Sequence, residues 1–267
     1  MADQRRVHPH LVVHDDGAVR VLRIDREEKL GAFSGSLVAA LGREVAALQD
    51  AEDVRAVVLT GTGKGFVAGA DIGEYATSGR AEFEAYQHRS RLVFDALSAL
   101  PQPTVAAVNG YAFGGGFEIA LCCDVILCSS NARFGLPEVR LGLVPGGGGP
   151  PRLAREFGTR WTKEVVMTGR TVYPEEARAR GVVARVIEPD QLSGAALELA
   201  TTLAELPAEA VRVAKRRIDL GREQDLEAAL TDDQTALGEL FETPDAREGI
   251  EAFLQKRPPV FARPPLG

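Results

Sequence analysis

The chain has 267 residues, of which 45% are hydrophobic and 26% charged, and its net charge is −7. This length suits one large domain or a domain with an appendage, and the negative charge disfavours nucleic acid as the main partner. No apolar run approaches the roughly 20 residues of a membrane span, and the polar first residues lack the apolar core of a signal peptide. We therefore expect a cytoplasmic globular protein that binds neither nucleic acid nor membrane.

The first hundred residues are predicted to alternate strands with helices. Two apolar stretches flank Asp15-Asp16-Gly17, which is typical of a β-hairpin. Ser36 is predicted to cap the next helix, and Pro101 and Pro103 close a longer one. The predicted order is a hairpin at 11–14 and 19–24, a polar loop at 25–35, a helix at 37–49, a buried strand at 54–60, a glycine-rich loop at 61–71 and a helix at 81–100.

Residues 104–124 hold the most informative pattern in the chain. Thr104 to Val108 predict a buried strand, which Asn109-Gly110 ends with a turn. Gly114 to Gly116 follow, and three consecutive glycines favour an unusual backbone conformation or a close backbone approach. Directly behind them, Glu118 enters an apolar segment, where a charged carboxylate is costly to bury. Its position therefore needs an explanation, and catalysis is one.

Beyond Asp124 the chain is predicted to become mainly helical. A strand is predicted at 124–128 and an irregular segment at 134–145, and Pro150-Pro151 suit the first turn of a helix. The composition shifts near residue 192 to alanine and glutamate, so we predict a βα core over residues 1–191 and a helical region over residues 192–267. The remaining predicted elements are helices at 150–157, 159–168, 174–180, 190–205, 207–220, 224–241 and 244–256, and a strand at 183–187.

Two glycine-rich loops, 61–70 and 109–116, each follow a predicted strand. Such loops expose backbone N–H groups, and two N–H groups that point at one oxygen form an oxyanion hole. Neither fits a phosphate-cradling or dinucleotide-binding pattern, and taken alone each is more simply a tight turn.

Glu138 is a second candidate carboxylate. Alone it fits a solvated loop, whereas beside Glu118 it could divide general acid and base roles with it.

The cysteines and histidines do not predict a metal site. Cys122, Cys123 and Cys128 are too few and too close for a disulfide framework, and we expect buried free thiols. Three of the four histidines lie near the N-terminus, which favours a disordered end or a surface strand over a metal site. They are His8, His10 and His14.

Several ordered motifs closely resemble the enoyl-CoA hydratase/isomerase (crotonase) superfamily. The likeness extends from the first hairpin to residues 248–257 and so covers nearly the whole chain. The motifs are Ala68-Gly69-Ala70-Asp71-Ile72, the segment from Val105 to Glu118, Phe134-Gly-Leu-Pro-Glu138 and Pro145-Gly-Gly-Gly-Gly149.

This resemblance implies an α/β fold, a spiral of ββα units that carries the CoA and catalytic site. Helices that trimerise follow, which gives a homotrimer or a homohexamer. The resemblance also implies that the backbone N–H groups of Ala70 and Gly115 hold the thioester oxygen and stabilise the enolate.

By the same resemblance, the partner is an acyl-CoA thioester, coenzyme A enters only as part of the substrate, and no separate cofactor or metal is expected. Ala68 and the segment Asp71, Ile72 and Gly73 are expected to line the path of the CoA adenine and pantetheine. Phe253 and Lys256 resemble residues that a C-terminal helix offers to CoA.

The implied reaction adds water across the C2=C3 bond of a trans-2-enoyl-CoA to give a 3-hydroxyacyl-CoA. Glu118 would act as base toward the water, and Glu138 would deliver the proton to C2. Hydratases of the family have both glutamates, as this chain does, whereas members that only shift a double bond commonly keep one. The alternatives are an isomerase or other crotonase-type lyase, and a non-catalytic acyl-CoA-binding protein.

Three departures from the family pattern bear on the site. Gly31 stands where relatives usually carry Asn, in the early loop that contacts CoA. Pro150-Pro151 replace a commoner Thr-Gln before Arg152, which would alter the helix start beside Glu138. Phe117 is bulky next to Glu118 and would narrow the site.

Overall fold

The strands are divided between two sheets in a computed structural model that describes residues 4–261. The large sheet has the order β1-β2-β3-β4-β6-β8-β10, antiparallel between β1, β2 and β3 and parallel from β3 onward. Its strands are β1 (Gln4–His8), β2 (Leu11–Asp16), β3 (Val19–Ile24), β4 (Ala56–Gly61), β6 (Thr104–Val108), β8 (Val125–Ser129) and β10 (Arg185–Ile187). The small sheet is parallel and consists of β5 (Gly65–Val67), β7 (Tyr111–Phe113) and β9 (Arg133–Gly135).

Successive strands pass from one sheet to the other, which produces the expected spiral. Strand β4 leads to β5, β6 to β7 and β8 to β9, so each pair contributes one strand to each sheet. A helical segment follows each pair. These segments are α2 (Ile72–Tyr75) with α3 (Arg80–Ser98), then α4 (Gly115–Ala120), then the 3-10 helix η2 (Pro137–Leu141) with α5 (Gly149–Phe157). The three repeats bring their glycine-rich connections together at the small sheet.

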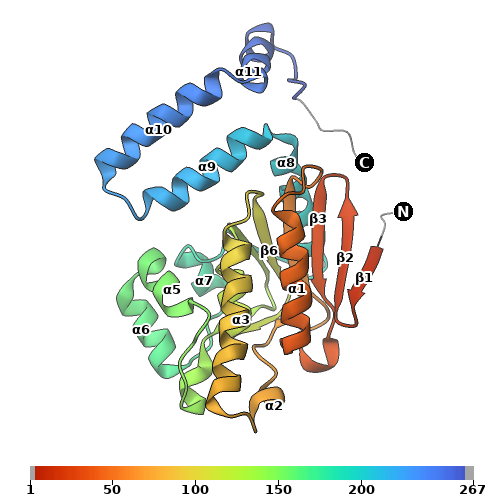
Figure 1. Ribbon diagram of the computed structural model, residues 1–267, viewed down its shortest axis with the longest axis vertical. Helices are drawn as coiled ribbons and strands as arrows, with labels where there is room; N and C mark the ends of the chain where they lie inside the picture. The colour runs from red at the N-terminus through yellow and green to blue at the C-terminus, as the bar shows by residue number, and fades with distance from the viewer. Residues whose placement is uncertain (1–3, 262–267) are drawn as a thin grey trace.

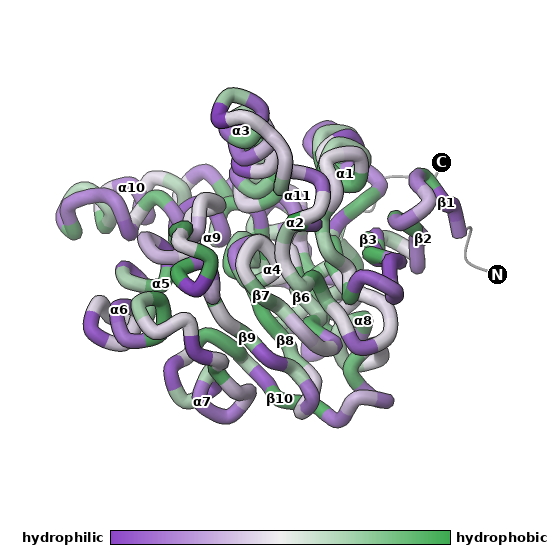
Figure 2. The backbone as a smooth tube through the Cα atoms, turned by 90° about the horizontal axis from the view of Figure 1, so that it is seen from below, coloured by the Kyte–Doolittle hydropathy of each residue, from purple (hydrophilic) through white to green (hydrophobic). Residues whose placement is uncertain are grey.

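The parallel strands of the large sheet are buried on both faces, which explains their continuous apolar runs. In β4, Val57 and Leu59 join the main core, whereas Ala56 and Val58 face a second cluster on the other side. The main core includes α1 (Gly35–Leu48) and α3, which lie side by side in Figure 1. Figure 2 shows hydrophobic stretches along β6, β7 and β8, among helices that carry hydrophilic stretches.

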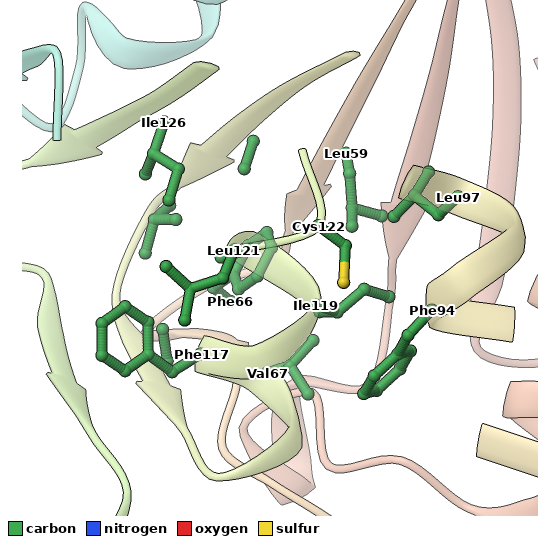
Figure 3. Packing of buried hydrophobic residues seen from close by; sticks show 14 of the residues in the cluster. Leu59, Phe66, Val67, Phe94, Leu97, Phe117, Ile119, Leu121, Cys122 and Ile126 are labelled. Carbon is green, nitrogen blue, oxygen red and sulfur yellow. The ribbon is translucent and has the colours of Figure 1, made fainter. Parts of the chain in front are cut away.

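Helix α4 runs through the main core and carries the central carboxylate. Figure 3 shows Phe117, Ile119 and Leu121 of this segment among buried side chains from neighbouring elements. The Phe117 ring is fully buried and lies 5.2 Å from the Phe134 ring, centroid to centroid. The expectation that Phe117 narrows the site is therefore wrong, because its side chain packs into the core and does not line the cavity described below.

The second cluster is covered by α8 (Leu192–Glu205). Its inward stripe repeats every four residues and is mostly alanine, so the helix can lie close to the sheet. The stripe consists of Leu192, Ala196, Ala200 and Ala204. The first helix of the predicted C-terminal region thus packs on the large sheet, and the division of the chain at residue 191 stays a prediction.

The last three helices extend away from the sheets at the top of Figure 1. They are α9 (Ala208–Gly221), α10 (Leu226–Phe241) and α11 (Pro244–Gln255). Arg217 of α9 joins α9 to α10 through Asp233, at 2.7 Å, and Asp232, at 3.3 Å. The exposed large apolar side chains on these helices include Ile218, Leu226, Leu230, Leu237, Phe241, Phe253 and Leu254.

Near the N-terminus the structure differs from the sequence prediction in the N-cap of α1, and it shows a strand, one of the two alternatives predicted for the histidine-containing end. Helix α1 begins at Gly35 because Ser34, not Ser36, is its N-cap: the Ser34 hydroxyl accepts a hydrogen bond from the Leu37 N–H at 3.1 Å. Residues 4–8 form strand β1, which pairs with β2. His8 and His10 therefore lie at a sheet edge, and their ring centroids are 5.7 Å apart.

Neither a membrane span nor a metal cluster is present in the described part of the chain. Over residues 4–261, every helix is too short or too polar to cross a bilayer. Over the same residues, His, Cys, Asp and Glu side chains nowhere gather in threes in a way that could hold a metal ion. The three cysteines are free thiols.

Candidate active site

A short helix at the end of β7 places Glu118 beneath the run of four glycines. The side chain is only 3% exposed, and its Oε1 accepts hydrogen bonds from the N–H groups of Gly147, at 2.8 Å, and Gly149, at 2.9 Å. A Cβ at Gly147 would lie 2.6 Å from Glu118 Oε2, and one at Gly149 would lie 3.0 Å from its Cγ. The glycines therefore allow two backbone donors to approach the carboxylate.

The start of α5 explains why these donors are available. The first N–H groups of a helix have no intrahelical partner and favour a nearby anion. Gly149 is the first residue of α5, and the prolines that follow it occupy the first turn as predicted. Burial raises the pKa of Glu118, and the backbone donors of Gly149, Gly147 and Gly148 act against this rise. Nothing in the local sequence links this glycine run to Glu118.

Glu138 enters the site from η2 and has a different environment. Burial raises its pKa to about 7, and the charge of Glu118 adds to the rise. Its Oε2 atom is buried and has no hydrogen-bond partner within residues 4–261. A Cβ at Gly114 would lie 2.7 Å from Glu138 Oε1, so this carboxyl group lies directly beside the glycines that begin α4.

The two glutamates line one cavity of about 340 Å³. The sequence could only suggest that they act as a pair, and the structure brings them together. Apart from them the walls are largely apolar and include six aromatic residues, which come from the loop before α1 and from α2, α3 and β7. These aromatic residues are Phe33, Tyr75, Phe83, Tyr86, Phe94 and Phe113.

The two predicted oxyanion residues line the same cavity. Ala70 lies between Gly69, with φ 107°, and α2, and Gly115 begins α4 after Gly114, with φ 52°. A Cβ at Gly114 would lie 3.8 Å from the Gly69 Cα, so the two loops pass close to each other. Within the described residues, neither Ala70 nor Gly115 donates its N–H to another group of the chain. Both donors remain available to a ligand.

The residues predicted to contact CoA are not all brought to this cavity. Ala68 and Ile72 line it, whereas Asp71 and Gly73 do not. The Asp71 carboxylate instead pairs with Arg26. Phe253 and Lys256 lie in α11 and at its C-terminal cap, at the opposite end of the molecule from α2 (Figure 1).

The Gly31 departure has a backbone explanation. Gly31 has φ 77°, a conformation that glycine adopts without strain, and a Cβ there would collide with the Phe66 carbonyl. Its N–H donates to the Arg26 carbonyl at 2.9 Å, which closes the loop that precedes α1. Gly31 therefore shapes this loop through its backbone.

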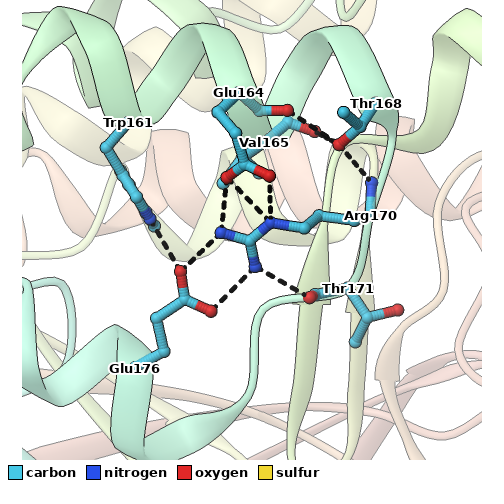
Figure 4. A network of polar contacts seen from close by, with 7 residues as sticks. All are labelled: Trp161, Glu164, Val165, Thr168, Arg170, Thr171 and Glu176. Carbon is cyan, nitrogen blue, oxygen red and sulfur yellow. Dashed lines mark hydrogen bonds and ion pairs between the residues drawn. The ribbon is translucent and has the colours of Figure 1, made fainter.

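An ion-pair network centred on Arg170 lies near the segment that carries Glu138, and Figure 4 shows its members. Arg170 lies between α6 (Thr159–Thr168) and α7 (Pro174–Ala179) and donates to both Glu164 and Glu176 at 2.6 Å. A Cβ on the preceding Gly169 would lie 3.2 Å from Val139 Cγ2, the residue next to Glu138. The network therefore fixes the connection against which the Glu138 segment packs, and it could not be predicted from the sequence alone.

The family model for enoyl-CoA hydratase/isomerase matches residues 14–264. The chain belongs to this family. It is 38% identical to the short-chain-enoyl-CoA hydratase of Clostridium acetobutylicum over 249 residues, which is 93% of this chain and 95% of the relative. It is also 38% identical to the mitochondrial methylglutaconyl-CoA hydratase of Homo sapiens over 264 residues, 97% of this chain and 77% of the relative.

Solved structures of enoyl-CoA hydratases show the same fold. The enzyme of Bacillus anthracis superposes with a TM-score of 0.92 at 34% identity, covering 94% of this chain and 98% of the other. The two-sheet spiral and the helices that follow it are thus those of the enoyl-CoA hydratase/isomerase family, as the sequence motifs implied.

Proposed function

We propose that this protein is an enoyl-CoA hydratase that adds water across the C2=C3 bond of a trans-2-enoyl-CoA to give a 3-hydroxyacyl-CoA. The observation that carries this proposal is the pair Glu118 and Glu138, which line one cavity but differ in their hydrogen bonding. The names of the relatives agree with this reaction type.

In the proposed reaction, the thioester oxygen accepts hydrogen bonds from the N–H groups of Ala70 and Gly115. Glu118 takes one proton from a water molecule, whose oxygen bonds to C3 while the electrons of the double bond move onto the thioester oxygen. Glu138 then gives a proton to C2, which restores the carbonyl. One water is consumed, and a proton then passes from Glu118 to Glu138, directly or through solvent, which restores both protonation states before the next turnover.

The different surroundings of the two carboxyl groups support these roles. Backbone donors stabilise the carboxylate form of Glu118, which is the form a base needs. The buried Oε2 of Glu138 has no hydrogen-bond partner among the described residues, and burial raises the pKa of this group to about 7, which leaves it partly protonated at neutral pH. Such a group suits proton donation to C2.

The reaction as proposed uses only water and the thioester, so we propose no separate cofactor. Coenzyme A would pass Ala68 and Ile72, which line the cavity. Phe253 and Lys256 would reach a CoA molecule only in another subunit of the proposed homotrimer or homohexamer, because α11 lies at the opposite end of the molecule from α2, which lines the cavity. Free thiols at all three cysteines fit a reducing cytoplasm, where we propose the protein acts.

The alternatives fit this cavity less well. An isomerase or related lyase needs one carboxyl group to move a proton, which leaves the second unexplained. A protein that only binds acyl-CoA needs neither, and burying two carboxyl groups without a role lowers stability.

Turnover of crotonyl-CoA separates these functions, because hydration removes the absorbance of the conjugated thioester. We expect that absorbance to fall and 3-hydroxybutyryl-CoA to form. With a 3-enoyl-CoA as substrate, appearance of the conjugated absorbance without a hydrated product would identify an isomerase. Binding without turnover of either substrate would identify a non-catalytic protein.

A further inference from the structure

A buried ion pair lies directly behind the Ala70 loop. Arg26 Nη2 and Asp71 Oδ2 are 2.7 Å apart, and the two side chains are 12% and 13% exposed. Arg26 follows strand β3, whereas Asp71 comes 45 residues later, immediately after Ala70. The pair therefore links two segments that are distant in the sequence.

The same two segments are joined by a short parallel bridge between Phe33 and Ala70. The Phe33 N–H donates to the Gly69 carbonyl at 2.8 Å, and the Asp71 N–H donates to the Phe33 carbonyl at 2.8 Å. Because a peptide group is planar and trans, fixing the Gly69 carbonyl also fixes the direction of the Ala70 N–H, which points the opposite way. The bridge thus sets where the proposed oxyanion donor points.

Arg26 holds both sides of this bridge with one guanidinium group. Its Nη1 donates to the Ala32 carbonyl at 2.8 Å, and its Nη2 donates to Asp71. Ala32 precedes Phe33, and Asp71 follows Ala70, so the planar group spans the bridge from outside. A lysine ammonium at the same place cannot reproduce this forked geometry.

The pairing also explains why Asp71 does not line the cavity. The hydrogen bond from Arg26 lowers the pKa of Asp71, so its carboxylate is ionised and engaged. Neither side chain lines the cavity, whereas Ala70 does. Their effect on the reaction is therefore transmitted through the backbone of residues 69–71.

We propose that Arg26 and Asp71 are positioning residues that hold the Ala70 N–H in the direction of the thioester oxygen. This inference rests on the proposed function, since it assigns a supporting part to the oxyanion hole of that reaction. Loosening the pair weakens a hydrogen bond that matters most when charge develops on the oxygen. Loosening the Arg26–Asp71 pair should therefore lower kcat and change KM little.

The test uses a ligand whose colour reports this hydrogen bond. 4-Dimethylaminocinnamoyl-CoA is a conjugated thioester whose excited state places negative charge on the carbonyl oxygen, so donors to that oxygen shift its absorption to longer wavelength. The variants are Asp71→Asn and Arg26→Lys. The matched control is Asp15→Asn, which disrupts the Arg20–Asp15 pair, also 2.7 Å long, in the β2–β3 hairpin.

We expect the wild type and Asp15→Asn to shift the absorption of the bound probe fully. Asp71→Asn and Arg26→Lys should lose half or more of this shift and about 10-fold or more in kcat on crotonyl-CoA. Circular dichroism and thermal unfolding identify any variant that misfolds. If Asp71→Asn misfolds, Arg26→Lys, which keeps the positive charge, tests the positioning role on its own.

A full shift with wild-type kcat in either folded variant would overturn the inference, as would a wild type that binds the probe without any shift. Failure of the proposed function has a different signature. In that case the wild type shifts the probe absorption but does not hydrate crotonyl-CoA, and the loss of the shift in the variants still tests the positioning role.

Discussion

Glu118 and Glu138 share one cavity but differ in how the surrounding backbone binds their carboxyl groups. Two N–H groups bind Glu118 Oε1 within 2.9 Å, whereas Glu138 Oε2 is buried without a partner in the described chain. The two carboxyl groups thus differ more clearly in their hydrogen bonding than in their burial. This difference is the basis for assigning one as base and the other as acid.

Replacing either glutamate by glutamine should lower kcat on crotonyl-CoA by on the order of 10²-fold or more, the scale of general acid–base catalysis. Glutamine keeps the size of the side chain but cannot exchange a proton. Steady-state rates of Glu118→Gln and Glu138→Gln measure the effect. Circular dichroism should match the wild type. A wild-type rate in either folded variant would remove that residue from the mechanism.

The pH dependence of kcat/KM should have a falling limb above about pH 7. A general acid must be protonated, and the pKa of Glu138 is raised to about 7, so the competent fraction decreases as the pH rises through this value. Toward acid pH, the rate should fall again as Glu118 becomes protonated. The falling limb should be absent from the residual activity of Glu138→Gln, and its persistence there would assign it to another group.

Ala70→Pro should remove one oxyanion donor, because proline has no N–H. The expected loss is about 3–4 kcal/mol of transition-state stabilisation, provided that the loop keeps its shape. Ala70→Gly is the matched control, since it retains the N–H and should retain much of the activity. Undiminished turnover by a well-folded Ala70→Pro enzyme would mean that the thioester is polarised elsewhere.

An acyl group with a terminal carboxylate should be a poor substrate. None of the described residues that line the cavity is Lys, Arg or His, and two glutamates are already present. A further carboxylate would be buried without a partner. We expect kcat/KM for glutaconyl-CoA to be at least about 10²-fold below that for crotonyl-CoA. Comparable values would show that a cation reaches the acyl group in the assembled enzyme.

The exposed apolar side chains of α10 predict a trimer-based oligomer. Leu237 and Phe241 are 68% and 65% exposed, and such residues usually mark an interface. Leu237→Asp should weaken the assembly, whereas Met167→Asp, at an equally exposed apolar position on α6, should not. Light scattering measures the mass. A wild type that stays at the 28.6 kDa of one chain at micromolar concentration would contradict this prediction.

The sequence predicted the longer elements because their signals are local. Thr104 to Val108 is a continuous apolar run, and the helix at 159–168 has the predicted bounds. The strands β5, β7 and β9 were missed because each has three residues beside glycine-rich turns, too few to show a periodicity. They exist because they pair with one another in the small sheet.

The residues of the candidate site likewise fall into those that the sequence reveals and those that only the fold reveals. Glu118 could be found because a carboxylate among apolar residues is conspicuous. Its two backbone donors at Gly147 and Gly149 could not, since nothing local links residues 29 and 31 positions apart. The sequence likewise does not reveal that Arg26 engages Asp71, because only the fold brings β3 and the Ala70 loop together.

Addition of water across a double bond by the two glutamates leaves the atoms of that water at defined positions in the product. Crotonyl-CoA is turned over separately in D₂O and in H₂¹⁸O, and the product is analysed by NMR and mass spectrometry. We predict 3-hydroxybutyryl-CoA with one deuterium at C2 from the reaction in D₂O and with ¹⁸O in the C3 hydroxyl from the reaction in H₂¹⁸O. Unchanged crotonyl-CoA, or a shifted double bond without ¹⁸O, would contradict this prediction.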